Sequence, residues 1–167
     1  MQILRAKELN AFLNSRGRAH SLQNLKSEPL ELMDLSSHFR MPESFGRVLV
    51  TIGIAVRLLE FDRWALLVVE DRGIWPNWED LHAFYCLSIE AGLESDIAAG
   101  DAFKFEKEDS HRVFSFVQMM SNFRWGFRLI CDRRNFHLAV THDDDSTFYS
   151  SRMTQEISDG LQKAVQE

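Results

Sequence analysis

The chain has 167 residues, a length typical of one domain, and 45% of them are hydrophobic. This apolar content excludes a disordered chain and is sufficient for a core without disulfides. The net charge of −6 argues against a nucleic-acid-binding protein, because such binding depends on neutralising phosphates. The two cysteines, Cys86 and Cys131, lie in apolar runs and are expected to be buried free thiols in a reducing compartment.

The first residues lack the apolar segment of a signal peptide. The longest uncharged apolar stretch lies between Arg47 and Arg57. It is about half as long as the ~18–20 residues that a membrane-spanning helix needs. We therefore expect a soluble, cytoplasmic protein with no membrane partner.

Residues 3–14 are predicted to form a short helix with one apolar stripe. The stripe consists of Leu4, Leu9, Phe12 and Leu13. Residues 20–40 are weakly patterned, and one helical turn is predicted around Leu30–Leu35. The stretch from Pro42 to Glu60 is ambiguous because it contains β-branched residues and two glycines. Its helical spacing and its length favour a buried helix over a strand.

A buried central strand is predicted for Trp64–Val69, because this short apolar run ends in turn residues up to Gly73. Asn77 can cap a helix that begins near Trp78 and ends at Gly92. The run Ala102–Lys107 then alternates apolar and polar residues, which predicts a half-buried strand.

The next helix is predicted to begin at a cap formed by Asp109 or Ser110. Its apolar stripe consists of Val113, Phe116, Val117 and Met120. Two strands, Phe127–Cys131 and Phe136–His142, flank a polar turn and predict a hairpin. The last segment has an apolar residue at every fourth position, which predicts an amphipathic helix. Its apolar positions are Met153, Ile157, Leu161 and Val165.

This order of elements predicts a single α+β domain over residues 1–167, with helices packed on a small, mostly antiparallel sheet of about four strands. No internal repeat or linker divides the chain.

Three groups of residues are candidates for chemistry or binding. His142, Asp143 and Asp145 follow a predicted strand, and histidine and carboxylates there suit a divalent metal. A solvated loop explains these aspartates more simply, and His137 and His142 are expected on opposite strand faces.

Trp75 and Trp78 flank a turn after a central strand, where they can line a ligand pocket or anchor a partner. The alternative is that Trp78 only packs the following helix on the core. His82 and Cys86 share one face of that helix, but a buried structural thiol is the favoured interpretation for Cys86.

A third group contains basic and aromatic residues in alternation, a pattern seen in nucleic-acid-binding proteins. Its basic residues are Arg124, Arg128, Arg133 and Arg134. Strand alternation explains the pattern equally well, with Phe127 and Leu129 facing inward and Arg128 facing outward.

The segment Leu66–His82 resembles a group of uncharacterised bacterial proteins. The shared features are a hydrophobic strand, a Gly-x-Trp-Pro turn at Gly73–Pro76, and a helix with histidine and aromatic residues. Trp125-Gly126 and His142-Asp143 look similar too. The resemblance covers mostly residues 64–150 and implies a soluble bacterial protein with no established activity.

The leading hypothesis is a non-enzymatic interaction or accessory protein, immunity-like with an acidic face. No catalytic constellation or cofactor motif stands out. Residues 90–109 carry seven acidic and two basic groups, and residues 141–167 carry six and two. Such acidic stretches suit a basic protein partner, although simple solubility is the favoured explanation of the charge. The alternatives are a metal-dependent hydrolase that uses His142, Asp143 and Asp145, or a small-molecule-binding domain. The sequence leaves the oligomeric state open.

Overall fold

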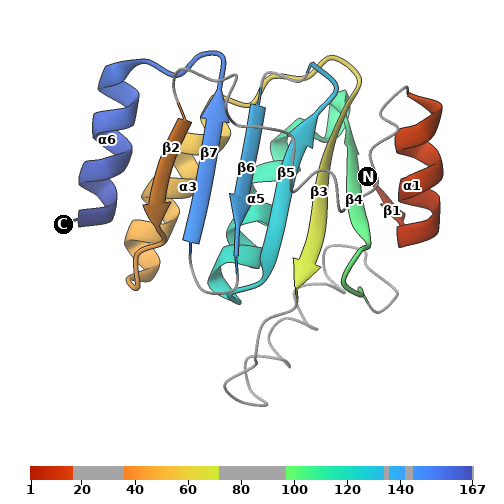
Figure 1. Cartoon of the computed structure of the whole chain (residues 1–167), viewed down its shortest axis with the longest axis horizontal. Coiled ribbons are helices and arrows are strands. Elements are labelled where there is room, and N and C mark those ends of the chain that lie inside the picture. Colours follow the sequence, from red (N-terminus) through yellow and green to blue (C-terminus); the bar gives the residue numbers. More distant parts are fainter. Residues whose placement is uncertain (17–35, 72–96, 134–135, 142–144, 167) are drawn as a thin grey trace.

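A computed structural model describes residues 1–16, 36–71, 97–133, 136–141 and 145–166 (Figure 1). The elements in chain order are β1 (Gln2–Leu4), α1 (Ala6–Ser15), β2 (Ser36–Arg40), α3 (Phe45–Arg57), β3 (Trp64–Asp71), β4 (Ala102–Glu106), the 3-10 turn η2 (Lys107–Asp109), α5 (Ser110–Asn122), β5 (Gly126–Cys131), β6 (Phe136–Val140), β7 (Asp145–Ser150) and α6 (Gln155–Gln166).

The described strands form one seven-stranded sheet in the order β1-β4-β3-β5-β6-β7-β2. Every neighbouring pair is antiparallel. The predicted α+β class with an antiparallel sheet is confirmed, and β3 is central as expected. The prediction of about four strands is wrong, because β1, β2 and β7 were not recognised. β1 and β2 pair with strands far away in the sequence, so no local turn signals them, whereas β7 pairs with the preceding strand β6 and has few apolar residues.

Helices α3, α5 and α6 pack on one face of the sheet, and Figure 1 shows α3 and α5 behind the strands. The ambiguous segment from Pro42 to Glu60 does form a helix, α3, whose Ile52 and Ala55 are fully buried. The stripe predicted for α5 is buried as expected, and Leu161 of α6 joins the same core. Hydrophobic periodicity therefore identified all three described helices that cover this face.

The opposite face is covered at one end by α1. Leu9 and Leu13 of α1 pack with Leu66 and Val68 of β3 in a second, smaller core. The predicted helix over residues 3–14 begins later than expected, at Ala6, because residues 2–4 pair with β4 as strand β1. Leu4 is apolar in either arrangement, so its position in the stripe could not reveal the strand.

A buried carboxylate ties α1 to the loop before β4. Asp101 accepts hydrogen bonds from Arg5 Nη1 (2.6 Å), from the backbone N–H of Ala6 (3.1 Å) and from that of Ala98 (3.0 Å). Gly100, just before it, has a φ of +91°, a backbone conformation that glycine adopts without strain. Asp101 thus satisfies donors from two segments that are far apart in the chain.

Other predictions are confirmed with shifted ends. β5 and β6 are an antiparallel pair as predicted, although β6 ends at Val140. Asp109 precedes α5, but its carboxylate binds the N-terminal amine instead of capping that helix. The turn predicted at Leu30–Leu35 and the helix predicted between Asn77 and Gly92 lie outside the described residues. None of the described helices is long and apolar enough to cross a membrane.

Candidate functional site

Most of the residues predicted for binding or chemistry lie outside the described part of the chain. This holds for Trp75, Trp78 and His82, for Cys86, and for His142 and Asp143. Asp145 is described, and it is the first, exposed residue of strand β7 instead of part of a loop. Its carbonyl oxygen accepts a hydrogen bond from Thr141 N (2.8 Å), so the backbone is already paired there.

The described residues contain no group of three side chains that could hold a metal ion. The proposed metal site at His142, Asp143 and Asp145 therefore stays a prediction.

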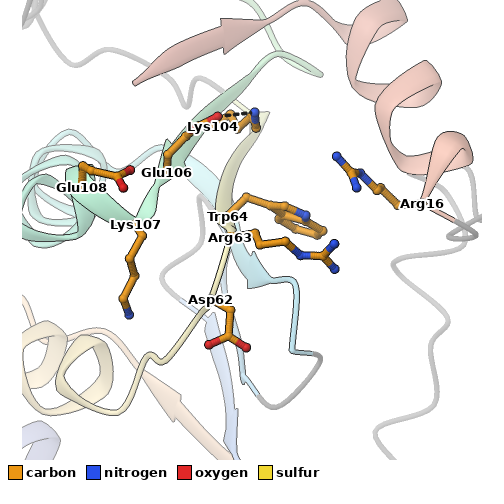
Figure 2. A pocket seen from close by; sticks show the side chains of 8 residues that line it. All are labelled: Arg16, Asp62, Arg63, Trp64, Lys104, Glu106, Lys107 and Glu108. Atoms are coloured by element: carbon orange, nitrogen blue, oxygen red, sulfur yellow. Dashed lines mark hydrogen bonds and ion pairs between the residues drawn. The ribbon is translucent and has the colours of Figure 1, made fainter.

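One shallow hollow of about 270 Å³ lies where β3 begins and β4 ends (Figure 2). Its lining residues are Arg16, Asp62, Arg63, Trp64, Lys104, Glu106, Lys107 and Glu108. Trp64 is 3% exposed and packs edge-on against Phe12, with ring centroids 5.3 Å apart. Trp64, the single large apolar side chain of the lining, is therefore part of the smaller core under α1.

Most charges of the hollow are used within the protein. Lys104 Nζ binds Glu106 Oε1 (2.8 Å), and Lys107 Nζ donates to the carbonyl of Phe61 (2.7 Å). The Lys104 ammonium beside Glu106 lowers the pKa of that carboxyl. Because these charges are engaged in contacts within the protein, we interpret the hollow as a consequence of the packing around Trp64 and not as a binding site.

Next to the hollow, two arginines form ion pairs between three connecting segments of the fold. These segments lie between α3 and β3, after β5, and between β7 and α6. Arg133 Nε donates to Asp62 Oδ2 (2.9 Å), and Arg133 Nη1 lies 3.2 Å from Glu60 Oε2. Arg152 Nη1 donates to Glu60 Oε1 (2.8 Å). The hydrogen bond from Arg133 lowers the pKa of Asp62. Arg133, one residue of the predicted basic cluster, is therefore engaged in ion pairs, and Arg134 is not described.

Arg128 differs most from the prediction. It faces away from the helix-covered core, as alternation requires, but its side chain is only 7% exposed instead of lying on the surface. Arg128 lies on β5, between β3 and β6 in the middle of the sheet. The sequence does contain one sign of this burial, a charged residue within the apolar run of β5. That sign can be interpreted only when β5 is known to be a central strand.

Arg128 has one ion-pair partner among the described residues. Its Nη2 lies 2.8 Å from Oε1 of Glu70, which is 24% exposed. The register between β3 and β5 shifts between Val69 and Asp71, so Glu70 is the extra residue of a β-bulge. Bulges re-aim side chains, and here the carboxylate reaches Arg128. The Nε and Nη1 atoms of Arg128 are buried and have no hydrogen-bond partner among the described residues.

His137 of β6 lies on the same face, in register with Ile130 of β5 and Tyr149 of β7. Its Nε2 atom is also buried and has no partner within the described ranges. Burial, together with the positive charge of Arg128, lowers the pKa of His137 to about 4. The imidazole is therefore neutral at neutral pH, and it can offer Nε2 either as a donor or as an acceptor.

The neighbouring strands add further polar side chains to this surface. We call it the Arg128 face, and it consists of His38, Arg128, His137, Ala139, Thr147 and Tyr149. The strand registers place all six on the side of the sheet turned away from α3, α5 and α6. Thr147 Oγ1 lies 3.2 Å from His38 Nδ1. Of the helices in the described ranges, only α1 packs on this side, at the far end of the sheet.

Comparisons with protein-family models, with curated proteins and with solved structures find no match for this chain. The resemblance of residues 64–150 to uncharacterised bacterial proteins therefore stays an expectation, and function has to be argued from the Arg128 face itself.

Proposed function

We propose that the protein is a non-enzymatic interaction protein that recognises another protein through the Arg128 face. The observation that supports this is a buried arginine whose Nε and Nη1 donors are unused within the described residues. Buried donors are nearly always paired in folded proteins, so an unpaired set at a sheet surface suggests that a partner completes it.

The composition of the face fits recognition better than catalysis. Tyrosine and arginine are enriched where proteins bind one another, and Tyr149 and Arg128 are both partly or fully buried here. His137, with its lowered pKa, is a poor general base at neutral pH because a catalytic pKa is usually close to the working pH.

In the acidic stretch over residues 90–109, three described carboxylates that were expected to attract a basic partner have other roles. Asp101 binds Arg5, Glu106 binds Lys104, and Asp109 binds the N-terminal amine. These carboxylates stabilise the fold, which is why we place recognition on the Arg128 face and not on residues 101–109.

The experiment is affinity capture with the full chain and with matched surface variants. A partner bound by the wild type should be lost with Thr147→Arg, which adds bulk in the centre of the face, and with Tyr149→Ala. It should be retained with Lys163→Glu, an exposed change on α6. Equal capture by all variants, or no selective capture by the wild type, would contradict the proposal.

A further inference from the structure

We infer that Arg128, Glu70 and His137 form a binding site for one carboxylate group. The inference concerns the chemistry of the ligand, and it depends on the proposed function only for the source of that group, an acidic side chain or a chain terminus of the protein partner. The site itself can be tested with small anions alone.

The first step is the state of Arg128. A guanidinium group has five N–H donors and cannot lose its charge in a protein. The ion pair with Glu70 uses Nη2 alone, while Nε and Nη1 are buried without a partner in the described part of the chain. A charged acceptor satisfies such donors with hydrogen bonds roughly twice as strong as those of a neutral acceptor.

The second step is the charge that the site tolerates. Glu70 already balances Arg128, and Glu70 is held at the β-bulge beside it. A dianionic phosphate would place two further negative charges near Glu70, and Arg128 is the one cation that the described residues place in contact with Glu70. A carboxylate adds one negative charge and offers two planar oxygens, the geometry that arginine recognises best. The site therefore favours a carboxylate over a phosphate.

The third step is the role of His137. Its Nε2 is buried and has no partner among the described residues, and its pKa of about 4 keeps the ring neutral. In the tautomer with the proton on Nε2, the ring donates a hydrogen bond without adding charge. His137 is thus a neutral second donor beside Arg128, and a bound carboxylate should make its protonation easier by placing a negative charge nearby.

The test is a titration of the full chain with small probe molecules. NMR is the readout, through the signals of the Arg128 Nε–H group and of the His137 ring. The probes are acetate, acetamide and inorganic phosphate, each against chloride at constant ionic strength. Acetate should shift both signals in a saturable way and should raise the pKa of His137, while acetamide and phosphate should have little effect.

The matched variants are Arg128→Lys and Arg128→Met, with Arg152→Met as a control arginine on the surface. Losing the planar guanidinium in Arg128→Lys should weaken acetate binding on the order of tenfold, and Arg128→Met should abolish it. Arg152→Met should bind as the wild type does, which separates site binding from general salt effects.

Three outcomes overturn the inference. These are equal effects of acetate in wild type and Arg128→Met, tighter binding of phosphate than of acetate, and equal binding of acetamide. Acetate binding that survives while no protein partner is captured would leave the site standing and refute only the proposed function.

Discussion

A charged side chain buried in the middle of a sheet stabilises the fold only when its partners are complete. Arg128 has one ion pair, with Glu70, and the Nε and Nη1 donors remain unused within the described residues. Buried ion pairs often contribute little because the desolvation of the charges offsets their attraction. Residues of this kind are commonly retained for binding and not for stability.

This leads to a prediction for stability. Replacing Arg128 by methionine, which has a similar shape without charge, should leave the free energy of unfolding unchanged within about 1 kcal/mol or should raise it. Glu70, which is partly exposed, can then be solvated by water. Urea unfolding of both proteins measures the effect. A loss of more than about 3 kcal/mol, the range for breaking a required buried pair, would show that Arg128 is structural.

His137 should make the fold sensitive to mild acid. Its pKa is about 4 in the folded protein, below the ~6.5 of an unfolded histidine. As the pH falls below about 6.5, the unfolded chain takes up a proton that the folded protein binds only near pH 4. This proton uptake lowers the free energy of unfolding by about 2 kcal/mol between pH 7 and pH 5.

The measurement is urea unfolding at pH 7 and at pH 5 for the wild type and for His137→Gln. The difference between the two proteins isolates His137 from the carboxylates that titrate in the same range. The variant should lose less stability on acidification. An identical pH dependence in both proteins would contradict the burial of this ring.

At the level of the elements, Asp101 is the contact that holds α1 to the loop before β4. Replacing it by alanine leaves the N–H groups of Ala6 and Ala98 without their acceptor and removes the ion pair with Arg5. We expect a loss of about 1–3 kcal/mol, the usual cost of an unpaired buried group.

Denaturant unfolding gives the magnitude, and amide hydrogen exchange should show faster exchange in α1 than in α5. The control is Asp159→Ala on α6, an exposed position whose change should have little effect. If α1 exchanges as slowly in the Asp101→Ala variant as in the wild type, the carboxylate does not hold the helix in place.

The elements also show which parts of the fold a sequence can reveal. Helix α3 was found in spite of Gly46 and Gly53, because the apolar face that it buries repeats at helical spacing. β2 was missed because it begins Ser36-Ser37-His38 and lies at the edge of the sheet, where few apolar residues are needed. The buried positions of β7 are Ser146, Phe148 and Ser150. Phe148 is the one apolar residue among them, so the strand shows no apolar alternation in the sequence.

The same limit applies to the Arg128 face. Its members come from four strands, and the register that places His38 beside Thr147 joins positions more than a hundred residues apart. Alternation correctly placed Arg128 on the face opposite Phe127 and Leu129. Whether that face is solvent or interior depends on the order of the strands, which no local pattern contains.

For the whole molecule, the apolar core under α3, α5 and α6 runs continuously beneath the sheet, from Phe103 on β4 to Phe39 on β2. A core of this extent should not need a metal to fold. The melting temperature should therefore change by less than about 2 °C when a strong chelator is added.

Calorimetry with and without the chelator checks this prediction. A larger drop would mean that a metal ion stabilises the folded state, and it would favour the alternative of a metal-dependent hydrolase in which Asp145 acts with His142 and Asp143.

The order of the strands also determines when the sheet can close during synthesis. The two edges, β1 and β2, are made before their partner strands, because Gln2 pairs with Lys104 and Ser36 pairs with Tyr149. At about 5–20 residues per second, β2 waits roughly 6–20 s for its partner strand to be made. During that time, its backbone N–H and C=O groups lack their sheet neighbour. We therefore expect the sheet to close only once β7 has been made, and we expect a chaperone that shields nascent strands to have its largest effect until then.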